Sequence, residues 1–339
     1  MSQNIFKSLL LAGGCAAFLT LAAQAASFTG YGELFASAGY MAQSYSDTYP
    51  PVCAGPAMLC IRPMPEYVCV PYLHPCGGPY TYNFHSDADL LNLGGSAHGN
   101  IAFDSGLGLQ FDVSGQDRGY GSNSTSGFGI GTHIYERDAD FLYGGFVSIG
   151  DSYNGRLVTA GLEGQAYLDK FTLYTQASYS TAIQGTLEQY NTHSWNLHTE
   201  ARYFYTDNIV FSGGLGASLA HKNWSWEGVD YSNYNAGILQ WDLRAEYLLD
   251  DLPLGLFAAY QGSSVTWHDN ELYWYYPNTN KALYRNNTIM LGLRFYFGQN
   301  SLLSNDRSGA SLEDYNPWYG TQPDLITANG NYPPIAMPL

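Results

Sequence analysis

Most of the chain follows a two-residue alternation of apolar and polar side chains, broken at intervals by short polar turns. Residues 107–114 read Leu-Gly-Leu-Gln-Phe-Asp-Val-Ser, and residues 195–205 keep the same alternation. Strict alternation over about four or more residues is typical of a β-strand with one apolar face. Helical spacing with capping residues is nowhere convincing, so the pattern predicts an all-β fold.

The alternation divides the chain into an even number of expected strands. Each is about 10–14 residues long, close to the ~9–11 residues with which a strand tilted by about 45° crosses a bilayer. The twelve expected strands span residues 28–39, 87–102, 106–117, 127–136, 140–149, 156–168, 171–182, 194–205, 209–221, 236–249, 254–267 and 286–297.

The connections between these strands alternate between a short and a longer kind. The short ones contain Asp, as in Asp104-Ser105, Asp169-Lys170 and residues 250–253. The longer ones are residues 40–86, 118–126, 150–155, 183–193, 222–235 and 268–285. Outer-membrane barrels have short periplasmic turns and longer external loops, whereas a soluble sandwich has no reason to keep that order. The order predicts a transmembrane antiparallel up-and-down β-barrel of about 12 strands.

The composition agrees with a surface that water does not cover. Charged residues make up 12% and aromatic residues 16% of the 339 positions, whereas a soluble domain carries about 25% charged residues. A disordered chain is excluded because it would have few aromatics and many charges. The formal net charge of -16 disfavours nucleic acid as a partner because phosphate would be repelled.

The N-terminus has the pattern of a secretory signal peptide at residues 1–25. Lys7 precedes an apolar stretch at residues 9–22, and Ala23-Gln24-Ala25 is an A-x-A cleavage site. A membrane anchor would need ~20 apolar residues. Lipoprotein processing at Cys15 is disfavoured because the preceding Ala-Gly-Gly lacks the usual Leu. We therefore expect an exported protein.

The cysteines of the exported part lie together in a proline-rich stretch, and four cysteines in an oxidising compartment predict two disulfides. Similar sequence around Cys53 and Cys69 favours Cys53–Cys60 with Cys69–Cys76, although all three connectivities stay open. A zinc site is the alternative, but no C-x2-C spacing is present. We expect the disulfides to staple an external loop at residues 40–86, which would constrict the mouth or serve as a recognition surface.

The parity of the alternation assigns a set of ionisable side chains to the barrel interior. Acids and bases are interleaved there, which fits either an ion-selective constriction or an ion-pair network that fills a narrow barrel. The expected lumen residues are Glu163, His198, Glu200, Arg202, Asp242, Arg244, Glu246 and Arg294.

Aromatic residues are placed where the two membrane interfaces would lie. Trp195 and Tyr205 share one face, and a rise of ~3.4 Å per residue with a strand tilt of ~40° separates them by about 25 Å along the membrane normal. The plainer alternative is that aromatics favour strands in general. The expected aromatic girdle comprises Trp195, Tyr205, Trp267, Phe295 and Phe297.

Catalytic and metal-binding patterns are weak. A nucleophile and its base must lie within hydrogen-bond reach, but His193 and Ser194 are adjacent and point to opposite faces of a strand. Glu200 and Glu246 each have an arginine nearby that would keep the carboxylate ionised. The histidines do not cluster at metal-ligand spacing. We expect no enzyme activity, no metal site and no cofactor.

The closing strand at residues 288–298 and the Ser-Leu-Leu-Ser-Asn-Asp-Arg-Ser-Gly-Ala tail at residues 301–310 resemble outer-membrane β-barrel proteins of Gram-negative bacteria, in particular a poorly characterised porin-like group. The resemblance implies outer-membrane lipids, the barrel-assembly machinery and small-solute permeants as partners. Such barrels often end on the aromatic of the last strand. Here the chain continues for about 40 residues after Phe297, and that tail either lies loosely in the periplasm or enters the lumen.

The combined expectation is a signal peptide at residues 1–25, a barrel at residues 26–298 and a periplasmic tail at residues 299–339. The expected function is porin-like passive diffusion of small solutes through the outer membrane. The alternative is a closed structural or adhesin-like surface barrel without transport. A soluble secreted all-β protein is a third, less specific interpretation.

Overall fold

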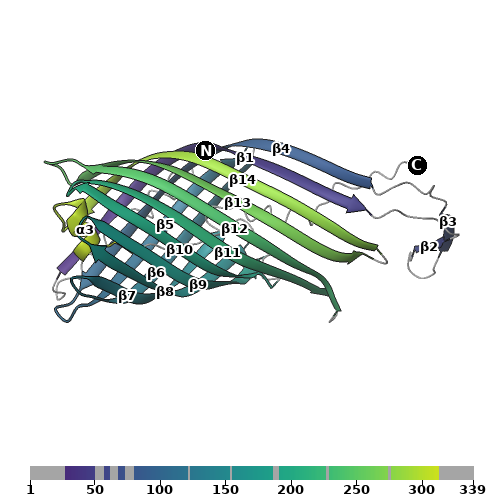
Figure 1. Cartoon of the computed structure of the whole chain (residues 1–339), viewed down its shortest axis with the longest axis horizontal. Coiled ribbons are helices and arrows are strands. Elements are labelled where there is room, and N and C mark those ends of the chain that lie inside the picture. Colours follow the sequence, from purple (N-terminus) through teal and green to yellow (C-terminus); the bar gives the residue numbers. More distant parts are fainter. Residues whose placement is uncertain are drawn as a thin grey trace.

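The chain folds into one closed β-barrel with a short helix at one end (Figure 1). The structure is a computed structural model, and it describes residues 27–49, 57–61, 68–72, 80–120, 123–152, 155–185, 191–226, 229–273 and 276–312. The barrel strands are β1 (Ser27–Tyr49), β4 (Tyr80–Ala102), β5 (Leu107–Tyr120), β6 (Asn123–Arg137), β7 (Phe141–Ser152), β8 (Gly155–Leu168), β9 (Phe171–Gly185), β10 (His193–Thr206), β11 (Ile209–Trp226), β12 (Val229–Leu248), β13 (Leu254–Tyr273) and β14 (Tyr276–Phe297).

Each barrel strand pairs antiparallel with its neighbours in the sequence, and β1 closes the barrel against β14. The closing register runs from Gly30 opposite Phe297 to Thr48 opposite Thr279. Closure satisfies the backbone groups that a sheet edge would expose, which is the requirement for a barrel surrounded by lipid. The prediction of an all-β, closed antiparallel barrel of about twelve strands is confirmed by the described strands.

The strands extend further at the long-connection end than the alternation predicts. The segment expected to be a connection at residues 268–285 is largely strand, because β13 and β14 stay in register up to Tyr273 opposite Tyr276. Alternation marks a strand only where one of its faces is apolar. Backbone pairing continues beyond that region without leaving the same signal in the sequence. Within the connection at residues 40–86, β2 (Ala57–Ile61) and β3 (Val68–Tyr72) form a separate two-stranded sheet.

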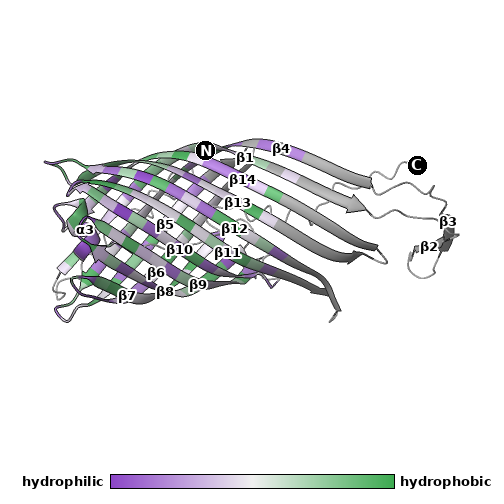
Figure 2. Cartoon of the chain, viewed as in Figure 1, coloured by the Kyte–Doolittle hydropathy of each residue, from purple (hydrophilic) through white to green (hydrophobic). Residues whose placement is uncertain are grey.

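Side-chain exposure alternates sharply along the strands. Leu162 is 73% exposed, whereas the next residue, Glu163, is 6% exposed. The same rule gives β9 an uninterrupted alternation of exposed and buried positions from Phe171 to Ser180, and the hydropathy colouring alternates along the ribbons (Figure 2). Large apolar side chains therefore cover the outside of the barrel, and polar side chains fill its inside.

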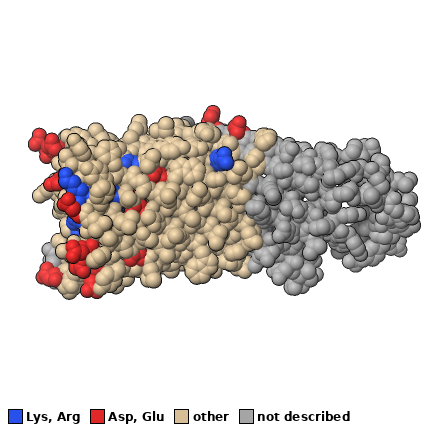
Figure 3. Space-filling view, in the orientation of Figure 1, with Lys and Arg blue, Asp and Glu red and all other residues tan. Residues whose placement is uncertain are grey.

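The short turns have local chemistry that explains their composition. Asp138 accepts hydrogen bonds from the backbone N–H groups of Asp140 and Phe141 at 2.8 and 2.7 Å, which is the usual way in which Asp stabilises a turn. Asp169 adopts a positive φ of 51°, and Asp tolerates that region better than most residues. Charged side chains gather at this end of the barrel, while the middle of the visible wall carries few (Figure 3).

Among the described residues, no helix is long and apolar enough to cross a membrane. The helix at the short-turn end, α3 (Leu302–Ser308), spans two turns at most and begins at Ser301, whose hydroxyl accepts a hydrogen bond from the Ser304 N–H. It lies across the end of the barrel (Figure 1).

Candidate functional site: the barrel lumen and its closed end

The barrel encloses a cavity of about 390 Å³ in the part of the chain that the structure describes. Its walls mix apolar side chains with amide, hydroxyl and charged side chains from both halves of the barrel. The carboxylates that face it outnumber the guanidinium groups. The charged lining residues are Glu33, Asp112, Glu200, Asp242, Arg244 and Arg294.

The structure places all of the expected lumen residues on the inner face. Five of them are buried, namely Glu163, His198, Glu200, Arg202 and Glu246. The remaining three are partly exposed and line the cavity, namely Asp242, Arg244 and Arg294. Their inward orientation follows from the two-residue period of a strand, and they fall into separate clusters that the linear sequence does not reveal.

The first cluster joins the two strands that close the barrel to β12. Glu33 Oε2 accepts hydrogen bonds from Arg294 Nη2 at 2.6 Å and from Arg244 Nη2 at 2.9 Å. Glu246 Oε2 lies 3.1 Å from Arg294 Nη1 and 3.3 Å from Arg244 Nη2. Two carboxylates therefore neutralise two guanidinium groups. Because both arginines are held between these acids, the cluster acts as a fixed wall of the cavity.

The second cluster is a chain of histidines and carboxylates that begins on β4, the other neighbour of β1. His98 Nδ1 lies 2.6 Å from Asp112, whose other oxygen lies 2.8 Å from His133 Nε2. His133 Nδ1 lies 2.7 Å from Glu163, and the Tyr174 hydroxyl donates to the second Glu163 oxygen at 3.0 Å. This arrangement orders β4, β5, β6, β8 and β9 through side chains that would otherwise be costly to bury.

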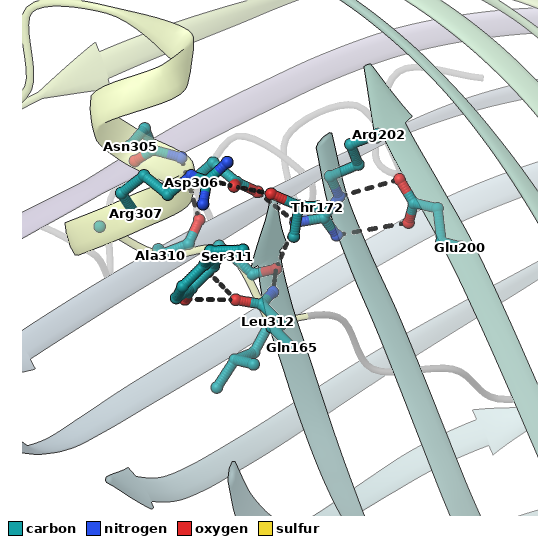
Figure 4. A network of polar contacts seen from close by, with 12 residues as sticks. Gln165, Thr172, Glu200, Arg202, Asn305, Asp306, Arg307, Ala310, Ser311 and Leu312 are labelled. Atoms are coloured by element: carbon teal, nitrogen blue, oxygen red, sulfur yellow. Dashed lines mark hydrogen bonds and ion pairs between the residues drawn. The ribbon is translucent and has the colours of Figure 1, made fainter. Parts of the chain in front are cut away.

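The third cluster connects the barrel wall to the C-terminal tail. Arg202 forms a two-point contact with Glu200, with Nε at 2.9 Å and Nη2 at 3.3 Å from its carboxylate oxygens. The remaining nitrogen, Nη1, donates to Asp306 at 3.0 Å and to the Ser311 carbonyl at 2.9 Å. Figure 4 shows this guanidinium between the barrel acid and the tail. The Thr172 hydroxyl also donates to Asp306, at 2.5 Å.

The tail enters the barrel directly after β14. Gly298 has a φ of +77°, and a Cβ at this position would lie 2.6 Å from the Phe28 carbonyl oxygen. Glycine is therefore the residue that allows the chain to turn inward here. Of the two arrangements that the sequence leaves open for the tail, entry into the lumen is the one that residues 299–312 adopt. The rest of the expected tail, residues 313–339, lies outside the described residues.

The end of the described tail is held mainly through its backbone. The Ser308 carbonyl accepts a bond from Asn100 at 3.4 Å, and both terminal nitrogens of Arg137 donate to the Gly309 carbonyl at 3.2 Å. The Ser311 carbonyl accepts from Gln165 at 3.0 Å. Gln110 donates to the Leu312 carbonyl at 2.7 Å and accepts from its N–H at 3.1 Å. We call these five barrel residues the tail-binding ring: Asn100, Gln110, Arg137, Gln165 and Arg202.

An apolar anchor accompanies these polar contacts. The Leu312 side chain is completely buried, and it belongs to a cluster of side chains from β6, β7, β8 and β9. Leu302 of α3 packs in another apolar cluster, which includes Tyr31 and Tyr296 on the two strands that close the barrel. The described tail therefore closes the short-turn end of the barrel through both polar and apolar contacts. The apolar cluster around Leu312 also contains Tyr135, Leu142, Tyr167 and Tyr174.

Several residues of these clusters are absent from the sequence prediction. Glu33 and Asp112 lie on expected strands with the inward parity, so the same alternation rule could have found them. Asp306 lies beyond the last strand, where parity gives no information. The sequence near Asp306 indicates only a local structure, because Ser301 and the following Leu-Leu pair are typical of the start of a helix with an apolar face.

The expected aromatic girdle is described in part. Trp195, Tyr205 and Phe295 point outward and are 63%, 59% and 54% exposed. Phe297 is half-buried because its ring stacks on Phe28, with the ring centroids 5.4 Å apart. The backbone of Trp267 lies in β13, but its side chain is outside the described part of the structure.

The expected disulfides fall largely outside the described residues. Cys53 and Cys76 lie in the segments that the structure does not describe. Cys60 and Cys69 lie on β2 and β3, where the backbone register places them opposite each other. The connectivity of the four cysteines stays a prediction.

Comparison with known proteins finds similar solved structures but no matching sequence family. No family model matches the chain, and no curated protein matches its sequence. An outer membrane channel from Pseudomonas putida F1 is 12% identical, with a TM-score of 0.41, over 78% of this chain and 96% of that one. The NanC porin is 12% identical, with a TM-score of 0.34, over 60% of this chain and 93% of that one.

A third neighbour is an enzyme, the outer membrane protease OmpT from Escherichia coli. It is 8% identical, with a TM-score of 0.30, and the match covers 81% of this chain and 99% of that one. All three proteins are outer-membrane proteins of the class that the sequence resembles. The barrel architecture of this chain follows from its own strand pairing.

Proposed function

We propose that this chain is an outer-membrane channel of the porin type, which lets small polar solutes diffuse through its lumen. The observation that carries the proposal is the reversal of polarity across a single wall. Leu162 faces outward and Glu163 inward, and the interior holds a cavity of about 390 Å³ whose lining includes charged side chains from both halves of the barrel. A structural barrel in water would need the opposite arrangement, with polar residues outside.

The orientation follows from the two kinds of connection. Outer-membrane barrels keep their short turns in the periplasm and their long hairpins outside the cell. The short-turn end, with α3, is therefore the periplasmic end in this proposal. Export by the signal peptide at residues 1–25 and insertion by the barrel-assembly machinery belong to the same proposal, and those residues lie outside the described structure.

The outer surface suits a bilayer. Leu34 on β1, Leu215 on β11 and Leu243 on β12 are between 61% and 64% exposed. Exposed leucines on this scale are unfavourable in water because each loses about 1.5–3 kcal/mol relative to burial. Contact with lipid removes that cost, and the surrounding membrane lipids are accordingly the first partner that we propose.

One observation favours a second candidate function, a closed surface barrel without transport. Residues 299–312 occupy the periplasmic end, where Asp306, Ser311 and Leu312 contact the wall directly. If that closure is permanent, the lumen is a filled interior, and the external hairpins carry the function.

Single-channel recording in planar bilayers separates the two candidates. Purified wild-type protein and an Asp306→Ala variant are each inserted, and insertion is verified by heat-dependent migration on gels. We expect discrete conductance steps from at least the variant, whose end is less tightly closed. Inserted protein that gives no steps in either form would overturn the channel proposal and leave the closed barrel.

A further inference from the structure

The tail-binding ring recognises a peptide backbone more than particular side chains. Its members contact the carbonyls of Ser308, Gly309, Ser311 and Leu312, and Gln110 contacts both the N–H and the carbonyl of the last of these. Such contacts suit a peptide segment with small residues beside one buried apolar side chain. The ring members come from separate strands, β4, β5, β6, β8 and β10, and Figure 4 shows two of them, Gln165 and Arg202, beside the tail.

Most ring members also have a partner on the barrel itself. Gln110 donates to both oxygens of Asp112, at 2.9 and 3.1 Å. Gln165 accepts from the Tyr167 hydroxyl at 2.8 Å. Asn100 accepts a short bond from the Tyr135 hydroxyl. Departure of the tail would therefore leave each of these three side chains with at least one hydrogen-bond partner on the barrel, which limits the cost of emptying the site.

The charge of Arg202 is balanced on the barrel without the tail. Arg202 is paired with Glu200 through two of its nitrogens, and both residues belong to β10. Asp306 adds a negative charge to a pair that is already neutral. Removing Asp306 therefore leaves Arg202 paired with Glu200, whereas removing Glu200 would take away the acid that the wall itself provides.

We propose that the tail-binding ring is a peptide-binding site that the chain's own residues 305–312 occupy reversibly, so that release of this segment opens the periplasmic end. The part of this proposal in which tail release opens a channel rests on the proposed channel function. The site itself does not, because occupancy of the ring can be measured in a barrel that conducts nothing.

Trypsin cleavage after Arg307 measures release independently of conductance. In the closed state Arg307 Nη2 donates to the carbonyls of Asp169 and Phe171, at 2.7 and 3.1 Å, and its backbone lies within α3. We expect slow cleavage at this bond in folded wild-type protein. In a Leu312→Ala variant, cleavage should be on the order of tenfold faster or more, because the lost leucine anchor is worth at least that factor.

A matched control lies in the same helix. Ser304 bonds to Ser301 and Ser308 and to the Gln299 side chain, all within the tail. Ser304→Ala should leave the Arg307 cleavage rate close to that of wild type. Both variants alter the tail and not the barrel, and the heat-dependent gel shift verifies that the barrel remains folded.

The outcomes separate the inference from the proposed function. Equal cleavage rates in wild type and Leu312→Ala, or equal acceleration by Ser304→Ala, would overturn the peptide-binding site. Specific acceleration by Leu312→Ala, without conductance in any variant, would keep the site and overturn the channel. Specific acceleration together with a higher open probability in Leu312→Ala would support both.

Discussion

Glu33 on the first barrel strand and Arg294 on the last are register partners, and their side chains meet inside the barrel at 2.6 Å. The pair bridges the junction at which the two ends of the barrel are joined. Arg244 of β12 shares the same carboxylate oxygen at 2.9 Å. One acid on β1 therefore connects three strands at the point of closure.

Replacing this acid should destabilise the barrel strongly. Glu33→Gln leaves Arg244 and Arg294 close together with a single carboxylate, and loss of one partner of a buried ion pair typically costs about 3–5 kcal/mol. The expected result is a lower urea midpoint for the heat-dependent gel shift. Glu136→Gln is a suitable control, because Glu136 is exposed and its contact is the Tyr143 hydroxyl. Equal midpoints for the two variants would contradict the prediction.

Asp242 should give the lumen a preference for cations. Its side chain is 32% exposed to the cavity, its ion-pair partner is His198 at 4.0 Å, and it pairs with no arginine among the described residues. Charged groups in a narrow passage select permeating ions by sign. In a salt gradient, Asp242→Asn should shift the reversal potential toward zero, whereas Asp251→Asn in an exposed turn should not. An anion-selective wild-type channel would contradict this assignment.

Gly298 should control docking of the tail. Gly298→Ala places a methyl group 2.6 Å from the Phe28 carbonyl at a φ of +77°, which costs about 1–3 kcal/mol. We expect faster trypsin cleavage after Arg307. Gly237→Ala is the matched control, because a Cβ there meets nothing within 4 Å. Equal cleavage of the two variants would show that the turn at Gly298 does not position the tail.

A charge on the outer face should oppose membrane insertion. Leu162 is 73% exposed, and arginine at the middle of the lipid face of a barrel costs about 2–4 kcal/mol. Leu162→Arg should lower the fraction of folded protein in lipid vesicles. Leu252→Arg, in a short turn where Leu252 is 55% exposed, should fold as well as wild type. Similar folding of both variants would argue against a lipid-facing Leu162.

The strand pattern could be predicted from the sequence because alternation records which face meets the apolar surroundings. The division between residues 127–136 and 140–149 depends partly on the order of the connections, and these two expected strands correspond to β6 and β7. The strand ends at the long-connection end of the barrel, such as the end of β13 near Tyr273, could not be predicted. Their pairing depends on backbone hydrogen bonds, which place little constraint on side-chain identity.

The inward residues were predictable for the same reason, but their partners were not. Parity assigns Glu200 and Arg202 to one face of β10, and their mutual contact follows from the spacing of two residues. The contact of Arg202 with Asp306 joins positions 104 residues apart. It depends on the path of the tail after Gly298. The sequence indicates a turn at this glycine and a helix that starts at Ser301, but it does not indicate that the tail turns into the barrel.

The route of the tail has a mechanical consequence. The segment begins on β14, one of the two strands at the closure, and its contacts with Gln165 and Arg202 lie on β8 and β10, far from that closure in the order of strands. The chain thus forms a tie across the interior. Any outward displacement of β14 that would part it from β1 must also strain this tie, so the contacts that resist withdrawal of the tail add to the β1–β14 pairing that resists opening of the wall.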